Sequence, residues 1–373
     1  MYARGADNMK TAKLLLRLFL SIVFMMLAVV AAYAIYLILT YSRIEDHLPL
    51  TVGGSPRLEV LPADGEYTVV TQNCGFGAYS PDFTFFMDGG TQSWANDKET
   101  VIRNIDAAAD MAASFSPDFI LFQEVDTDST RSYHVDEREQ MIAYFEDYSE
   151  VFAVNYHSAF IMYPLTQPHG ASNAGIQTFS RARITSAERR QLEISKGPDR
   201  YLDLDRCYSV SRIPVSDGKE LILYNIHSSA YGGNDAIRTS QMTQLFNDML
   251  SEYGKGNYCV CGGDFNHDFT GNSAEVLGVK EGADYGWAHP FPAELLPEGI
   301  SRCIDYDDPE LVASSRNCDV PAGPDSQTFV LDGFLVTGNV EVKELHNIDT
   351  GFAYSDHNPV VMRFVLKQEA AEG

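Results

Sequence analysis

The feature that most constrains this chain is a long apolar run near its N-terminus. No charged residue occurs between Leu18 and Ser42, a stretch of 25 residues. As a helix this stretch would be roughly 37 Å long, and the hydrocarbon core of a bilayer is about 30 Å thick. The sequence therefore predicts a short cytoplasmic N-terminus at 1–13 and a transmembrane signal-anchor helix at 14–42.

Charged residues on either side of the run predict its orientation. The basic residues before it are Arg4, Lys10, Lys13 and Arg17. After it, Arg43 is followed by the acidic residues Glu45 and Asp46. Because basic flanks stay in the cytoplasm, we expect a single-pass protein of the cell membrane whose large domain is extracytoplasmic. The alternative is a signal peptide cleaved near the small residues at 31–34, although apolar residues continue as far as Leu39.

The charge balance restricts the partners of the exported part. The chain has 52 acidic and 27 basic residues, and without residues 1–46 the remainder holds 49 acidic and 22 basic residues, a net charge of −27. Such a surface repels phosphate backbones, so no stable nucleic-acid partner is expected. The hydrophobic content of 45% can support a packed core, which excludes a disordered chain.

The exported part is expected to form one domain. Residues 43–65 contain several Pro and Gly without periodicity and predict a linker. A catalytic domain is predicted at 66–367 and a disordered tail at 368–373. Helices are expected from about Asp97 and over Asp235–Tyr253. The predicted strands are Tyr67–Asn73, Phe119–Glu124, Val151–Tyr156, Gly175–Ser180, Glu220–His227, Tyr258–Cys261, Phe329–Val336 and Val360–Leu366. Strands outnumber helices, which indicates an α+β domain.

Acidic, amide and imidazole side chains lie at the ends of six of these strands. They are Asn73, Glu124, His227, Asp264, Asn266, Asp332, Asp356 and His357. One Asn or Asp after a strand is usually a turn former, but turns alone would favour Gly, Pro and Ser at so many strand ends. Carboxylate and amide oxygens suit a hard cation, Mg²⁺ or alternatively Mn²⁺. A metal together with imidazoles and carboxylates fits hydrolysis of a phosphoester.

The motifs around these residues resemble a known family. In order they are TQNCG, FQEVD, YNIHSSAYGG, GGDFNHD, VLDGF and SDHNPV, and they cover roughly residues 67–366. The chain is similar to the endonuclease/exonuclease/phosphatase (DNase I-like) superfamily of metal-dependent phosphoesterases. The resemblance implies a four-layer α/β/β/α sandwich, with two sheets packed face to face, helices outside, and the site at one end.

The resemblance also implies roles for the residues that match. Asn73, Glu124 and Asp356 would bind the metal. The catalytic residues would be His227, Asp264, Asn266, Asp332 and His357. His227 would donate a hydrogen bond to the scissile phosphate, and Asn266 would bind a phosphoryl oxygen. Asp264 would orient or deprotonate the water, while Asp332 would fix the tautomer of His357. One departure is Gly333, where many members have an aromatic residue.

Three further residues are candidate substrate contacts. Asn173 falls where members of the family place a loop on the substrate side. Arg206 and Arg316 are candidate phosphate clamps because a guanidinium fork fits phosphate oxygens, although each could equally be a structural arginine. Cys303 and Cys318 bracket a polar loop and could form a disulfide outside the cytoplasm.

These features together predict a membrane-anchored, extracytoplasmic phosphoric ester hydrolase that requires Mg²⁺. Its substrate would be a small or lipid-linked phosphodiester or phosphomonoester, it would contact the bilayer through the N-terminal helix, and its catalytic domain would be monomeric. One alternative is a DNase I-like DNA or RNA endonuclease. Another is a catalytically inactive binding module, which should have lost at least one of the eight residues.

Overall fold

The computed structural model describes residues 2–230, 235–278, 288–304 and 311–368. The chain divides into two units, Met1–Arg43 and Ile44–Gly373, and we refer to the second as the globular unit. Most of the predicted tail at 368–373 lies outside the described residues.

The first unit consists of one helix, α1 (Tyr2–Thr40). Within it, Met9–Thr40 is apolar enough, with a mean hydropathy of 2.7, and long enough to cross a membrane. The helix begins earlier than the predicted residue 14, because the Lys and Arg residues before the apolar run are themselves good helix formers.

Two seven-stranded sheets form the globular unit. The first sheet has the spatial order β1 (Leu48–Leu50), β7 (Ser186–Gln191), β8 (Cys207–Pro214), β9 (Glu220–His227), β10 (Tyr258–Asp264), β16 (Asp332–Thr337) and β13 (Ile300–Cys303). The second sheet has the order β17 (Val340–Asn347), β18 (Val360–Leu366), β3 (Glu66–Asn73), β4 (Phe119–Asp126), β6 (Asn173–Ser180), β5 (Ser149–His157) and β2 (Val52–Gly54). Two short pairs complete the sheets, β11 (His267–Asp268) with β12 (His289–Pro290) and β14 (Ser315–Arg316) with β15 (Thr328–Phe329).

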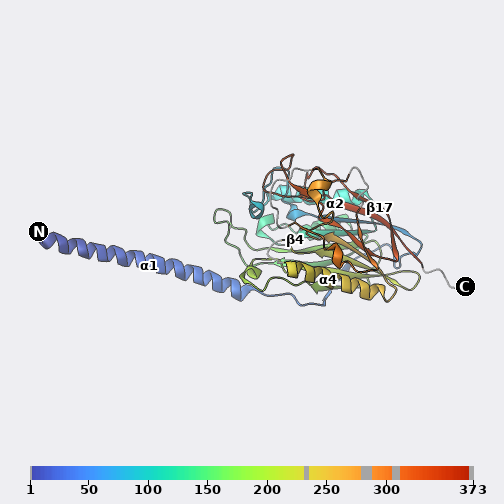
Figure 1. The fold of residues 1–373 in the computed structure, drawn as a ribbon, viewed down its shortest axis with the longest axis horizontal. Helices are drawn as coiled ribbons and strands as arrows, with labels where there is room; N and C mark the ends of the chain where they lie inside the picture. Colours follow the sequence, from blue (N-terminus) through green and yellow to red (C-terminus); the bar gives the residue numbers. More distant parts are fainter. Residues whose placement is uncertain (1, 231–234, 279–287, 305–310, 369–373) are drawn as a thin grey trace. The chain divides into compact units, whose positions relative to one another are not determined.

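Helices cover the outer faces of both sheets (Figure 1). The α-helices of the globular unit are α2 (Lys98–Ser114), α3 (Glu137–Tyr144), α4 (Asp235–Tyr253) and α5 (Ser273–Val276). Short 3₁₀ turns are η1 (Gly75–Gly77), η2 (Phe86–Asp88), η3 (Thr130–Ser132), η4 (Pro198–Tyr201) and η5 (Ala293–Leu295). Asp97 caps α2 by accepting a hydrogen bond from the backbone N–H of Thr100.

Alternation along the strands produces three apolar layers. Val69 of β3 and Leu223 of β9 belong to the layer between the two sheets. Val70, the next residue of β3, instead packs toward α2. Ile222 of β9 packs toward α4, which contributes Met242. Since successive strand residues face opposite sides, the eight-residue strands bury both faces, and the predicted four-layer α/β/β/α sandwich is confirmed.

Three sequence expectations differ from the structure. Part of the predicted linker forms β1 and β2, which pair with β7 and β5 at the edges of the two sheets. Such three-residue edge strands leave no periodicity in a sequence. The predicted strand Phe329–Val336 is interrupted before Asp332, where Val330 and Leu331 lie between β15 and β16. Cys303 and Cys318 are free and buried in different apolar layers, so they do not form the disulfide that the sequence left open.

Candidate active site

Strand register brings the predicted polar residues to one edge of the sandwich. β9 and β10 are parallel, so His227 lies opposite Asp264 at their carboxyl ends. β16 runs antiparallel to β10 and places Asp332 on the other side of Asp264. In the second sheet, β3 and β4 are also parallel and end together at Asn73 and the residues around Glu124.

A bulge in β4 turns Glu124 into the site. Phe122 and Val125 of β4 pair with Gln177 and Gly175 of β6, so two residues of β4 oppose one residue of β6 between these pairs. Glu124 has φ 53°, a left-handed conformation that is rare for glutamate. Such strained conformations concentrate at functional sites.

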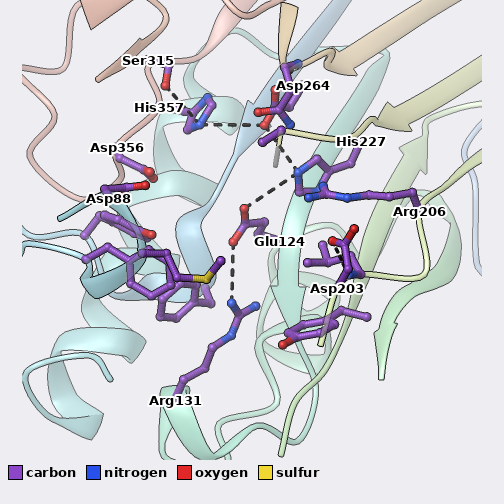
Figure 2. A pocket seen from close by; sticks show the side chains of 18 of the residues that line it. Asp88, Glu124, Arg131, Asp203, Arg206, His227, Asp264, Ser315, Asp356 and His357 are labelled. Atoms are coloured by element: carbon purple, nitrogen blue, oxygen red, sulfur yellow. Dashed lines mark hydrogen bonds and ion pairs between the residues drawn. The ribbon is translucent and has the colours of Figure 1, made fainter. Parts of the chain in front are cut away.

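The residues line a cavity of about 260 Å³. Six of the eight predicted metal and catalytic residues line it: Glu124, His227, Asp264, Asn266, Asp356 and His357. Asn73 and Asp332 lie directly behind them, since Asn73 donates to Asp264 over 3.0 Å and Asp332 contacts His357 over 2.7 Å. In Figure 2, His227 and His357 approach Asp264 from opposite sides.

His357 is held as a cation by two carboxylates. Its Nδ1 donates to Oδ2 of Asp332 at 2.7 Å, and its Nε2 lies 3.9 Å from Asp264. Burial disfavours the charged imidazole, but the carboxylates of Asp332 and Asp264 outweigh burial and raise the pKa of His357 well above its ordinary value. His357 therefore carries a proton at neutral pH.

His227 is held in the neutral state. Burial, together with the positive charges of Arg206, His357 and Arg131, lowers its pKa well below the ordinary value. The side-chain amide of Asn155 donates to Nδ1 of His227 over 3.3 Å, which leaves the proton of the neutral ring on Nε2. This Nε2 lies 3.6 Å from Asp264, so an N–H donor points into the site.

Oxygen donors of the site fit a divalent cation. Burial, together with the carboxylate of Glu124, raises the pKa of Asp356 to about 7. Burial also raises the pKa of Asp264 to about 6. Carboxylates crowded together in this way are stabilised by a hard cation with oxygen ligands. Asn73 lies beside these carboxylates: its amide nitrogen donates to Oε1 of Glu124 over 3.3 Å, and its amide oxygen accepts a hydrogen bond of 2.9 Å from the backbone N–H of Gly75.

A second group of carboxylate and imidazole atoms also lies close together. Ligand atoms of Asp264, Asp332 and His357 all lie within 4.8 Å of one another. However, Nδ1 of His357 and Oδ2 of Asp332 already share a hydrogen bond of 2.7 Å. At Glu124, by contrast, the imidazole nitrogen Nε2 of His227 lies 3.9 Å from Oε1, beyond hydrogen-bond distance.

Two buried arginines line the cavity beside Glu124. The guanidinium of Arg131 forms a two-point contact with Asp126 at 2.8 and 3.1 Å, and its Nη1 lies 3.9 Å from Glu124. Arg206 is only 3% exposed, and among the described residues its Nε and Nη1 have no hydrogen-bond partner. Arg206 was predicted, but Arg131 was not, since it occurs in a loop without a recognisable motif.

Other residues of the site could not be found from sequence. Asn155 is one of them, because an amide in the middle of a strand carries no signal. Asp88 and Asp356 lie side by side at the cavity in Figure 2. An apolar wall, which includes Phe76, Tyr79 and Phe85, forms part of the lining.

The other two predicted substrate contacts, Arg316 and Asn173, donate to backbone carbonyls. Arg316 lines the cavity, but its Nη atoms donate to the backbone carbonyls of Phe83, Asn317 and Val320, so it fixes the surrounding loops. Asn173 is exposed outside the cavity lining, and its amide donates to the backbone carbonyl of Asp128.

Fold and site together define a phosphoric ester hydrolase built on two packed sheets. The sequence model of the Endonuclease/Exonuclease/phosphatase family matches residues 70–357, and the chain belongs to this family. Enzymes of this family are divalent-metal dependent, which agrees with the donor set of the cavity.

Solved structures share the fold at low sequence identity. An endonuclease/exonuclease/phosphatase from Beutenbergia cavernae DSM 12333 has a TM-score of 0.51 and 14% identity, over 81% of this chain and 72% of that chain. ANGEL2, a 2′,3′-cyclic phosphatase in complex with adenosine-2′,3′-vanadate, has a TM-score of 0.53 and 12% identity, over 88% and 100%. D. rerio TDP2 complexed with single-strand DNA product has a TM-score of 0.50 and 14% identity, over 81% and 99%. No curated protein matches the chain significantly by sequence.

Proposed function

We propose that this protein is a membrane-anchored, extracytoplasmic, Mg²⁺-dependent phosphoesterase that hydrolyses a small or lipid-linked phosphodiester or phosphomonoester. The observation that carries the proposal is the convergence of the metal and catalytic candidates on one cavity, six in its lining and two directly behind them. A catalytically inactive module has no need to keep this arrangement intact.

The phosphate would be bound by donors from β9 and from the segments adjoining β8 and β10, all of the first sheet. His227 offers Nε2–H, because Asn155 occupies its Nδ1. Arg206 offers buried N–H groups that have no partner among the described residues. Asn266 would add its side-chain amide, which now donates to the backbone carbonyl of Ser228 over 3.0 Å. Donors fixed before the substrate arrives stabilise charge that develops on phosphoryl oxygens.

Glu124, Asp356 and Asn73 would hold the divalent ion. A divalent ion held by these residues would supply positive charge to offset the charge of the phosphoryl oxygens. Asp264 would then position the attacking water and accept its proton as the new P–O bond forms. His357, protonated through its pair with Asp332, would donate a proton to the leaving oxygen as the old P–O bond breaks.

The net charge of the globular unit and the N-terminal membrane anchor suggest the class of substrate. A net charge of −27 outside residues 1–46 opposes long polyanions. The neighbouring structures include a 2′,3′-cyclic phosphatase and an enzyme with a single-strand DNA product, so a small phosphoester and a nucleic acid are both chemically accessible to this fold. We favour the small or lipid-linked ester because the helix would concentrate the enzyme at a bilayer.

The domain boundaries form part of the same proposal. We place the anchor within α1 and the catalytic domain in the globular unit, whose first strands begin at Leu48. The four basic residues before the apolar run favour a cytoplasmic N-terminus and hence an extracytoplasmic domain. Protease added to intact cells should cut the globular unit; complete protection would contradict this orientation.

Hydrolysis of bis-p-nitrophenyl phosphate by the purified full chain in mild detergent tests the chemistry. We expect turnover with Mg²⁺ and none with EDTA. Glu124→Gln should reduce turnover by at least about 100-fold, whereas Glu99→Gln, on an exposed face of α2, should not change it. Turnover that survives EDTA or Glu124→Gln would overturn the proposed function. A short DNA duplex and a phospholipid panel, assayed alongside, separate the nuclease alternative from the ester we favour.

A further inference from the structure

Exposed apolar side chains occur in the cavity lining and in a loop that contacts it. In the described part of the globular unit, twelve large hydrophobic side chains are exposed; two of them line the cavity, and four lie in the loop 160–165, which is hydrogen-bonded to His169 of the lining. These six are Met87, Phe160, Met162, Tyr163, Leu165 and Leu202, and we call them the apolar rim. Exposed hydrophobic residues normally occur singly, so a cluster indicates an interaction surface.

Contacts with the cavity lining fix the rim in place. Met87 and Leu202 themselves line the cavity. The ring of Tyr163 lies 5.8 Å from that of Phe86, the neighbour of Met87. The backbone carbonyl of Tyr163 accepts a hydrogen bond of 3.1 Å from His169, which also lines the cavity. Leu165, at the outer end of this loop, is 82% exposed.

The chain enters the globular unit close to the same cavity. The backbone N–H of Ile44 donates to Asp205 over 2.7 Å, and Asp205 is the sequence neighbour of the cavity-lining residues Leu204 and Arg206. Helix α1 ends at Thr40, four residues before Ile44. Four residues span at most about 14 Å. The covalent link therefore keeps a bilayer that holds α1 within reach of the globular unit.

We propose that the apolar rim inserts into the bilayer that holds α1, so that the headgroup phosphoester of a membrane lipid reaches the cavity. This inference rests on the proposed function, since it names the substrate class of that site. Asp88, Asp199 and Asp203 also line the cavity, and they oppose an anionic surface. The matching surface is therefore a zwitterionic bilayer.

A fluorescent probe on the rim tests insertion without reference to activity. All six native cysteines are buried, so Leu165→Cys in the full chain can be labelled selectively with an environment-sensitive dye. In phosphatidylcholine proteoliposomes we expect a blue-shifted emission that nitroxide-labelled acyl chains quench. Ile102→Cys, on an exposed face of α2, is the matched control. The dye at this position should show the emission of an aqueous environment.

Activity of rim variants tests the substrate class. Met162→Ser combined with Leu165→Ser should lower hydrolysis of phosphatidylcholine in vesicles by at least about tenfold to a hundredfold, since one large apolar side chain moved from lipid to water already gives this factor. Hydrolysis of soluble bis-p-nitrophenyl phosphate should not change. Val60→Ser combined with Ile102→Ser, at exposed apolar positions outside the rim, should affect neither substrate.

The outcomes separate this inference from the proposed function. A Leu165 probe that stays in water overturns rim insertion, even if the enzyme hydrolyses soluble esters. A blue shift without quenching by nitroxide lipids means that protein, such as a second copy, covers the rim, and this also overturns the inference. Equal loss of both activities in the rim variant argues against a role in lipid access. If the wild-type chain hydrolyses neither substrate, the proposed function fails, while the probe still decides insertion.

Discussion

At the scale of single residues, the site assigns opposite protonation states to two buried imidazoles. His227 accepts a hydrogen bond from Asn155 and lies near the cations Arg206 and His357, so its pKa is lowered. His357 lies between two carboxylates, and its pKa is raised. A neutral donor and a protonated acid can therefore coexist on either side of Asp264 at neutral pH, as phosphoester hydrolysis requires.

Replacing Asp332 tests the assignment of His357 as the acid. Asp332→Asn removes the carboxylate that raises the pKa of His357, so this pKa should fall. Because the protonated imidazole is the active form, the alkaline limb of the pH–kcat profile should move to lower pH. The maximum kcat should decrease by about 10²–10⁴-fold, the usual range for general acid–base catalysis. An alkaline limb that stays in place would show that Asp332 does not control His357.

At the scale of secondary-structure elements, the candidate metal ligands are positioned by the segments at the ends of the strands as much as by the strands themselves. Glu124 depends on the bulge in β4. The position of Asp356 depends on Gly75, which lies two residues after the end of β3. Gly75 adopts φ 53°. A Cβ atom at position 75 would lie 2.7 Å from Oδ1 of Asp356 and would also meet the ring of Tyr79. Glycine is needed there for both its conformation and its small size.

Gly75→Ala tests this dependence. We expect a decrease of at least about 2 kcal/mol in the free energy of unfolding, measured by urea denaturation. We also expect a weaker Mg²⁺ dependence of hydrolysis, because Asp356 must move. Gly218→Ala is the matched control, since Gly218 has φ 86° with nothing within 4 Å of the added Cβ. This control should lose only about 1–2 kcal/mol and keep its Mg²⁺ affinity. Equal effects of the two variants on hydrolysis would refute the role of Gly75.

The carboxylate of Glu252 links helix α4 to the first sheet and makes the free energy of unfolding depend on pH. Glu252 accepts hydrogen bonds from Arg212 of β8 at 2.5 Å, from Lys255 at 2.8 Å and from Asn257 at 2.8 Å. Burial opposes these contacts, but together they lower the pKa of Glu252 to about 2. A lowered pKa means that the stabilisation is present above the unfolded value of about 4.3 and is lost as the pH falls toward 2.

Glu252→Gln should therefore be less stable than the wild type at pH 7, by about 1 kcal/mol. The difference should shrink as the pH is lowered from 5 to 2, and chemical denaturation at a series of pH values measures it. Glu146→Gln, at an exposed position, should match the wild type throughout. A deficit of Glu252→Gln that is independent of pH would mean that packing, and not charge, is responsible.

At the scale of the whole molecule, the two sheets form a self-sufficient core. The layer between the sheets and the two layers beneath the helices are all contributed by residues after Arg43. Removing residues 1–43 takes away no buried apolar group of these layers. The cavity and its lining also belong entirely to the globular unit.

Residues 44–373 should therefore fold without the helix. We expect a midpoint of thermal unfolding within a few degrees of that of the full chain in detergent, and unchanged turnover of bis-p-nitrophenyl phosphate. According to the further inference, only turnover of vesicle lipid should fall. An aggregated or unfolded product would show that α1 contributes to the stability of the globular unit.

The sequence by itself determined the class of fold and the identity of the principal polar residues. Apolar strands that end in Asn, Asp, Glu and His are local patterns, and the six motifs stand in the order of the family. Both can be read without distances. The match over residues 70–357 confirms the family, and the two-sheet sandwich confirms the fold.

Only the tertiary structure decided which of these residues meet and in what state. Arg131 and Asn155 carry no motif, and they reach the site because β4, β5 and β9 are brought together by non-local packing. Arg316 and Asn173 matched the expected chemistry but are held by backbone carbonyls instead. The charge of an imidazole depends on neighbours that are distant in sequence, because burial and nearby charges set its pKa, and both arise only when the sheets close around the cavity.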